Sequence, residues 1–132
     1  MLVRSPNCSK FGIIDLVTSD HTPIDIENKK TDIDNSKFGT IGLESFFGSL
    51  LTIFSLEKTI EILTRGKDIF KIEETTLNED SLAKLSLFTL SNEYEFSKEN
   101  ILSKSKNSAF LGLKITGKPL GIINSEKICI NE

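Results

Sequence analysis

The most regular hydrophobic pattern lies in the middle of the chain and predicts two consecutive helices. Between residues 43 and 54, leucine and phenylalanine recur at i, i+3, i+4, i+7, i+8 and i+11, which is the apolar face of a helix. Ser55 then offers an N-cap oxygen to a second helix, in which residues 56–63 keep the helical spacing. Gly66 is expected to cap the C-terminus of this helix, and residues 69–70 suit a weaker helical turn.

Patterns typical of strands lie on either side of these helices. Residues 13–18 are apolar and β-branched almost without alternation, which predicts a short buried strand. From about residue 82 the period becomes strand-like, and a turn is expected at residues 124–125. The predicted strand runs are 85–90, 94–96, 112–117, 121–123 and 127–130. Between them, the serine- and lysine-rich residues 103–108 suggest a solvated connection.

The composition excludes several classes of protein. A length of 132 residues suits one domain, and 38% hydrophobic with 27% charged residues describes a soluble chain. The net charge of -3 argues against a nucleic-acid partner. The apolar stretches are too short for a membrane span of about 18 residues, and the N-terminus lacks an apolar signal segment, so a cytoplasmic location is expected. Cys8 and Cys129 are expected to be free thiols, since the chain has no Cys-x-x-Cys pair.

The candidate chemistry follows the first predicted strand. Asp20 and His21 come directly after it and open a polar loop over residues 19–40, and loops of this length are usually functional or disordered. Barrel enzymes present metal ligands and bases in this way, at the C-terminal end of a strand. An aspartate that merely caps a loop is the alternative interpretation. His21 is the only histidine, so the chain cannot build a multi-histidine metal site alone.

Several segments, taken in order, resemble one family. Residues 17–23 (VTSDHTP), 27–29, 38–44 (FGTIGLE), 83–88 and 107–112 with 117–118 are similar to the C-terminal part of the dihydroorotases, a branch of the cyclic amidohydrolases. The likeness runs from about residue 11 to residue 131. Each segment is weak alone, but their common order and spacing make the resemblance fairly specific.

The resemblance implies an α/β fold that is a fragment of a larger architecture. The chain is well short of the roughly 250 residues of a complete (β/α)8 barrel. It is identified as the C-terminal fragment of a metal-dependent hydrolase TIM barrel, that is, the last strand and the following helices, plus part of the small β-sandwich domain. The expected divisions are a poorly patterned leader over residues 1–12, the last β/α unit over 13–72 and the β-sandwich portion over 82–132.

The resemblance also implies roles for individual residues. Asp20 occupies the position of the family's aspartate that binds a dinuclear zinc site and shuttles a proton, so it is the predicted catalytic and metal-binding residue. Phe38, Gly39 and His21 are the predicted substrate-binding residues, although Gly39 also suits a plain loop-to-helix junction and His21 an orienting or packed position. Ile24 departs from the family, which usually has a second histidine there to hold the substrate carboxylate.

The implied function is that of a zinc-dependent cyclic amide hydrolase, which opens the ring of dihydroorotate reversibly in pyrimidine biosynthesis. The other metal ligands of this family come from upstream strands, so the chain is expected to be truncated, to bind no zinc alone and to be inactive alone. Its expected partners are a small cyclic amide, a missing N-terminal barrel segment or a second copy of itself. The alternatives are a non-catalytic scaffold subunit and a related hydantoinase, dihydropyrimidinase or allantoinase.

Overall fold

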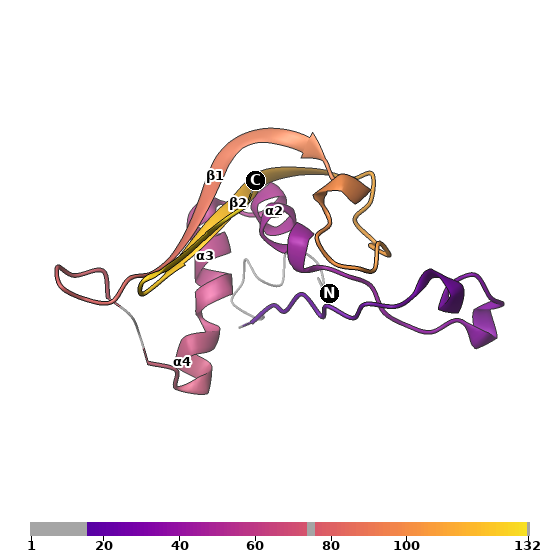
Figure 1. Cartoon of the computed structure of the whole chain (residues 1–132), viewed down its shortest axis with the longest axis horizontal. Coiled ribbons are helices and arrows are strands. Elements are labelled where there is room, and N and C mark those ends of the chain that lie inside the picture. Colours follow the sequence, from indigo (N-terminus) through magenta and orange to yellow (C-terminus); the bar gives the residue numbers. More distant parts are fainter. Residues whose placement is uncertain (1–15, 74–75, 132) are drawn as a thin grey trace.

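The computed structural model describes residues 16–73 and 76–131, in which a three-stranded sheet packs on a helical layer (Figure 1). The helices are α2 (Leu43–Ile53), α3 (Leu56–Thr64) and α4 (Gly66–Phe70). The strands are β1 (Lys84–Glu95), β2 (Lys114–Asn124) and β3 (Lys127–Ile130). Short 3-10 turns lie at Ile26–Asn28, Ile33–Asn35 and Lys98–Asn100. The first two belong to the predicted long loop, which extends away from the sheet and the helices (Figure 1).

The sheet is antiparallel with the order β1-β2-β3, and the five predicted strand runs merge into these three strands. The predicted gaps fall where the β1–β2 register shifts, between Leu87 and Phe88 and between Thr89 and Glu93. Phe88 pairs with Pro119, which has no N–H to donate, so the alternation of side chains is interrupted there without ending the strand. The predicted turn is confirmed, with Ser125 in the left-handed region at φ 57°.

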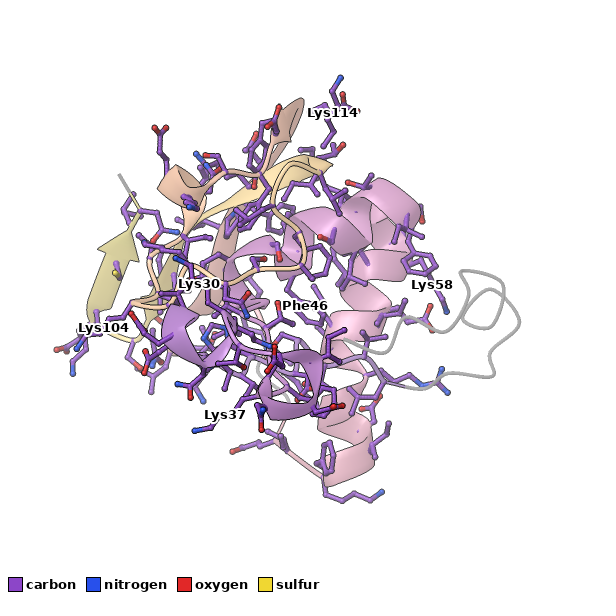
Figure 2. All side chains as sticks on the ribbon, turned by 90° about the vertical axis from the view of Figure 1, so that its right-hand side faces the viewer. Lys30, Lys37, Phe46, Lys58, Lys104 and Lys114 are labelled. Atoms are coloured by element: carbon purple, nitrogen blue, oxygen red, sulfur yellow. The ribbon has the colours of Figure 1, made fainter. Side chains whose placement is uncertain are left out.

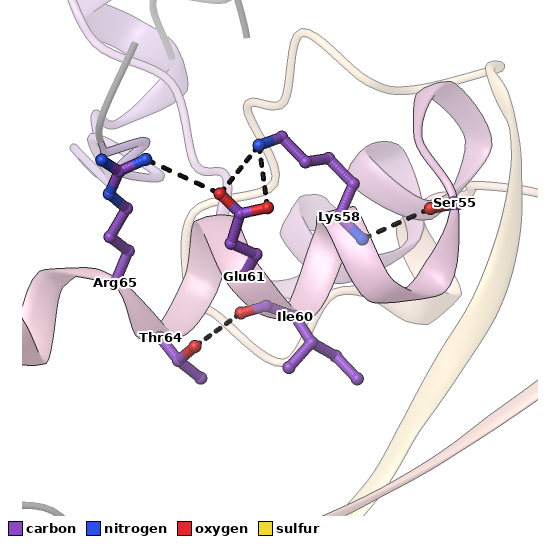
Figure 3. Close-up of polar contacts among 6 residues, drawn as sticks. All are labelled: Ser55, Lys58, Ile60, Glu61, Thr64 and Arg65. Atoms are coloured by element: carbon purple, nitrogen blue, oxygen red, sulfur yellow. Dashed lines mark hydrogen bonds and ion pairs between the residues drawn. The ribbon is translucent and has the colours of Figure 1, made fainter. Parts of the chain in front are cut away.

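The two predicted helices are confirmed, and the cap of the second is the expected one (Figure 3). The Ser55 hydroxyl accepts a hydrogen bond from the backbone N–H of Lys58 at 3.3 Å. The hydrogen bond from the Lys58 ammonium, joined by the charges of Lys58 and Arg65, holds the pKa of the Glu61 carboxyl below its usual value. Such exposed pairs stabilise a helix only slightly, so α3 depends mainly on its buried face.

The second helix ends where it was predicted to end, at Thr64 with Gly66 just beyond it, but Gly66 does not cap it in a left-handed conformation. Arg65 keeps a helical backbone at φ -56°, and Gly66 begins α4, so the predicted helical turn at residues 69–70 is the end of a third helix. A Cβ at Gly66 would lie 3.0 Å from the Leu16 side chain, so the glycine serves close packing rather than a left-handed cap. The left-handed backbone conformation occurs instead at Lys71, the C-cap residue of α4, where φ is 56°.

The core consists of two small apolar clusters. The first joins the segment before α2 to the sheet, and its buried members are Ile41, Phe96, Ile101 and Ile115. The second lies between α2 and α3, with Leu50, Phe54 and Ile62 buried and Val17 packed against them. The first cluster therefore sits beside the loop that carries the candidate chemistry.

The predicted strand over residues 13–18 is not present where the structure describes it. Residues 13–15 lie outside the described residues, and residues 16–18 have no strand pairing. Leu16 is 38% exposed, because a parallel strand needs neighbouring strands to cover it and the described part of the chain supplies none. Helices and an antiparallel sheet confirm the mixed α/β class, whereas the barrel unit and the sandwich portion stay predictions.

None of the helices described has the length and apolarity that a membrane span requires.

The charged residues that Figure 2 labels, Lys37, Lys58 and Lys114 among them, are spread over different sides of the molecule, while Phe46 lies among other side chains near its middle. Cys129 lies in β3 as predicted, and its thiol is free and exposed. Cys8 lies outside the described residues.

Helix α2 approaches β2 closely at two glycines. A Cβ on Gly48 would lie 3.0 Å from the Gly117 carbonyl oxygen, and a Cβ on Gly117 would lie 2.5 Å from the Leu51 side chain and 2.9 Å from the Thr89 carbonyl oxygen. Beside them, the Thr52 hydroxyl accepts a hydrogen bond from the Thr116 N–H at 2.9 Å. This contact fixes the helical layer on the sheet.

Gly117→Ala should destabilise the fold through both strain and collision. A left-handed alanine costs about 1–2 kcal/mol, and overpacking against Leu51 and the Thr89 carbonyl should add roughly 1–3 kcal/mol. Gly112→Ala is the matched control, because Gly112 has the same φ of 79° and a Cβ there would have no atom within 4 Å. Urea denaturation of both variants checks this, and equal losses of unfolding free energy would contradict the packing contribution.

Candidate functional site

Three segments far apart in the sequence meet around the predicted site residues. We call residues 20–24, 39–44 and 103–109 together the clasp. Its first two segments form a parallel β-bridge between His21 and Thr40, with the Thr22 N–H donating to the Thr40 carbonyl at 2.9 Å. Its last two are joined by the Ile41 N–H, which donates to the Asn107 carbonyl at 2.9 Å. The base of the long loop is therefore fixed to the segment that precedes β2.

The third segment is not the solvated connection that its composition suggested. Ser105 Oγ donates to the Ile24 carbonyl at 2.8 Å, and Asn107 Nδ2 donates to the Gly39 carbonyl at 3.0 Å. Ser103, Ser105 and Asn107 are half-buried, whereas the lysines between them are exposed, and Figure 2 shows Lys104 at the edge of the molecule. The alternation of small polar residues with lysines was the signal for this arrangement, since only one face of the segment meets the loop.

His21 is held at both nitrogens of its ring. Its Nδ1 accepts hydrogen bonds from the backbone N–H groups of Gly42 and Leu43, both at 3.2 Å, where α2 begins. Both donors lie at the start of the helix, where backbone N–H groups have no intrahelical acceptor, and the ring nitrogen supplies one. Its Nε2 lies 3.4 Å from the Ser103 hydroxyl. The His21 ring is therefore fixed by hydrogen bonds, whereas its orienting role and its substrate contact both stay predictions.

Glu44 and Ser103 complete this arrangement, and the sequence did not single them out. Glu44 Oε1 accepts two hydrogen bonds from Ser103, one from the N–H at 2.8 Å and one from the hydroxyl at 2.5 Å. Burial of the Glu44 carboxyl raises its pKa, but the hydrogen bonds from the Ser103 hydroxyl and from the backbone N–H groups of Ser103 and Glu44 together outweigh this effect, so the pKa lies below its usual value. The carboxylate is therefore the favoured form.

Asp20 differs from its neighbours in being exposed at the side chain and constrained at the backbone. It has φ 45°, in the left-handed region that few residues other than glycine, asparagine and aspartate enter. Its N–H donates to the Thr18 hydroxyl at 3.4 Å, and its carbonyl accepts from the Thr22 hydroxyl at 3.3 Å. Among the described residues, its carboxylate has no hydrogen bond or ion pair. A carboxylate in this state is available to a ligand.

The structure places the two other predicted substrate-binding residues differently. Phe38 is 96% exposed, so its ring packs on nothing in the described chain. Gly39 is half-buried at φ 139°, and a Cβ there would lie 2.6 Å from the Ile24 side chain and 2.9 Å from the Thr22 carbonyl oxygen. Gly39 therefore has a structural role at the loop junction, whether or not it also meets a substrate.

The described residues do not bring together a metal site. Within residues 16–73 and 76–131, no group of three or more histidine, cysteine, aspartate or glutamate side chains is placed to hold an ion. Asp20 could supply one oxygen ligand, whereas zinc sites generally have three or four protein ligands. The residues present thus do not fit a zinc centre unless further ligands join them.

Curated relatives of the chain are found by sequence, although no family model matches it. The dihydroorotase of Endomicrobium trichonymphae is 38% identical over 114 residues, which are 80% of this chain and 27% of that protein. The dihydroorotase of Fusobacterium nucleatum is 35% identical over 124 residues, or 89% and 29%. The Bacillus subtilis dihydroorotase is 34% identical over 128 residues, or 92% and 30%.

Solved structures agree on the fold. A D-hydantoinase (dihydropyrimidinase) from Thermus sp. matches with a TM-score of 0.80 at 20% identity, over 96% of this chain and 30% of that one. An L-hydantoinase (dihydropyrimidinase) from Arthrobacter aurescens matches with a TM-score of 0.77 at 23% identity, over 96% and 31%. The described fold therefore corresponds to part of a hydantoinase fold. By sequence the chain is related to the dihydroorotases, as its motifs predict, and it spans about three tenths of the length of these relatives.

Proposed function

We propose that this chain forms part of a cyclic amide hydrolase of the dihydroorotase type and supplies Asp20 to the reaction. The observation that carries the proposal is the state of Asp20, whose carboxylate is exposed and unpartnered among the described residues while its backbone is held in a left-handed conformation. Backbone strain of this kind costs about 1–3 kcal/mol and is concentrated at functional sites. The similarity to dihydroorotases over most of the chain supports the same reaction class.

In this reaction a water attacks the ring carbonyl and the amide C–N bond breaks. The Asp20 carboxylate is proposed to take a proton from the attacking water and to return it to the departing ring nitrogen, which is general base and then general acid catalysis. The zinc pair that the resemblance implies would supply an activated hydroxide. Asp20 alone does not make such a centre, so the remaining ligands would have to come from polypeptide beyond the described residues.

The substrate loop is proposed to meet the ring of the substrate through Phe38 and Gly39. The Phe38 side chain is free to pack on a ligand because it is almost fully exposed. The Gly39 carbonyl and backbone are fixed by Asn107 and by the contact with Ile24. A fixed backbone beside a free aromatic ring suits a small planar ring, which a cyclic amide presents.

Ile24 gives a reason to keep a second candidate substrate class. An aliphatic side chain cannot donate a hydrogen bond to the carboxylate of dihydroorotate, so a cyclic amide without a carboxylate, such as a hydantoin or a dihydropyrimidine, is the alternative. The position of Ile24 in the clasp keeps it beside Gly39, the predicted substrate contact. A scaffold without catalytic activity is the remaining alternative.

A hybrid enzyme tests the proposal. In the Bacillus subtilis dihydroorotase, the 128 matching residues would be replaced by this chain, and ring opening of dihydroorotate measured. Asp20→Asn should lower kcat by about 100-fold or more, because the amide cannot accept the proton. Asp34→Asn, which removes an exposed carboxylate from the same loop, is the matched control and should leave kcat unchanged. A folded hybrid without activity would favour the scaffold, and an active Asp20→Asn hybrid would rule out the proton transfer.

The same hybrid separates the two substrate classes. Ile24→His restores a donor for a substrate carboxylate, so it should lower KM for dihydroorotate by about 10-fold, which corresponds to roughly one charge-assisted hydrogen bond. Hydantoin has no carboxylate, and its KM should not fall. Ile24→Leu controls for the change of shape. An unchanged ratio of the two KM values would show that position 24 does not select the substrate.

A further inference from the structure

We propose that Glu44 and Ser103 are positioning residues that act through His21 to hold Asp20 in place. The inference deepens the proposed function and rests on it for its kinetic consequence only. It begins from Ser103, whose N–H and hydroxyl both donate to the same oxygen, Glu44 Oε1. With its proton committed to the carboxylate, the Ser103 oxygen is left as an acceptor, and it lies 3.4 Å from His21 Nε2.

The hydrogen bonds at Nδ1, on the other side of the imidazole, favour the same tautomer, with the proton on Nε2. Two backbone N–H groups, of Gly42 and Leu43, point at Nδ1, so this nitrogen must be unprotonated to accept them. A neutral ring then has its proton on Nε2, where Ser103 can accept it. The carboxylate at one end and the start of α2 at the other therefore specify one ring orientation and one tautomer.

Asp20 directly precedes His21, the residue whose ring is fixed in this way. The next residue along, Thr22, is held by its N–H to the Thr40 carbonyl at 2.9 Å. With the His21 ring fixed at both nitrogens and the following backbone fixed by the β-bridge, the left-handed backbone of Asp20 has little freedom to relax. The exposed carboxylate keeps its place without a partner of its own among the described residues.

The clasp does not need a charged group merely to stay closed. Ile41 joins the second and third segments by a backbone hydrogen bond and is 1% exposed in the first apolar cluster. Partial burial of the Glu44 carboxylate opposes its charge, and its Oε2 is buried without a protein partner beside a cavity of about 120 Å³ that Glu44 lines. The two hydrogen bonds from Ser103 outweigh this opposition, and they also fix the Ser103 hydroxyl beside His21 Nε2.

His21 is the only histidine, so the full chain offers a single-site readout. Long-range ¹H–¹⁵N spectra of the labelled chain should show the Nε2–H tautomer, and the Asp20 coupling constant should report a positive φ. Ser103→Ala and Glu44→Gln should each produce a mixture of tautomers and move the Asp20 signals, while Ser103→Thr, which keeps the hydroxyl, should restore them. Ser105→Ala is the matched control, because its hydroxyl also joins the loop but does not face His21.

Two results would overturn the inference: an Nδ1–H tautomer in the unaltered chain, or a tautomer and Asp20 signals that stay unchanged in both Ser103→Ala and Glu44→Gln. Circular dichroism confirms that each variant keeps its secondary structure, and Glu44→Gln, which is of the same size, decides the matter if Ser103→Ala does not fold. In the hybrid enzyme, Ser103→Ala should lower kcat about 10-fold with KM unchanged, and Ser103→Thr should recover it. An inactive unaltered hybrid would refute the proposed function alone, because the spectra need no turnover.

Discussion

The hydrogen bond from the Ile41 N–H to the Asn107 carbonyl, with the burial of the Ile41 side chain, is the contact on which the rest of the molecule depends. It joins the segment that enters α2 to the segment that enters β2, across 66 residues of sequence. Because Gly42 follows Ile41, the start of α2 is placed under the His21 ring. Apolar burial supplies most of the driving force here, and the polar groups select one arrangement within it.

The buried residues of the chain stabilise its fold, whereas the candidate catalytic residues lie on loops. Buried apolar residues form only two small clusters in the described part of the chain, while Ile33, Phe38 and Ile128 are 93%, 96% and 66% exposed. Single exposed apolar residues are ordinary, but here they accompany a small core, so the margin of stability depends strongly on the α2–β2 contact and the clasp. Catalytic residues on loops are positioned by such a scaffold and add little to it.

The sequence predicted the elements whose signal is local. Helical spacing located α2 and α3, and the Ser55 cap was visible one residue before the helix. Strand alternation located the sheet but broke at Pro119, since a proline changes the register without ending the strand. Residues 16–18, the described part of the strand predicted over 13–18, are not in a strand, since a buried parallel strand needs neighbouring strands that the described chain does not supply. Asp20 and His21 were singled out by their position after the predicted strand, and the resemblance added the roles expected of them.

The clasp could not be predicted because its partners are distant and aperiodic. Glu44 and Ser103 lie 59 residues apart, and His21 and Ser103 lie 82 apart. In the sequence, Gly42, Leu43 and Glu44 form one motif of the resemblance, yet the structure gives each a separate constraint. A Cβ on Gly42 would lie 2.8 Å from the Ser19 carbonyl oxygen, Leu43 gives its N–H to His21 with its side chain exposed, and Glu44 binds Ser103. The first two constraints act directly on the residues either side of Asp20, and the third acts on His21 through Ser103. A motif that predicts a helix start is therefore better understood as the support of the loop before it.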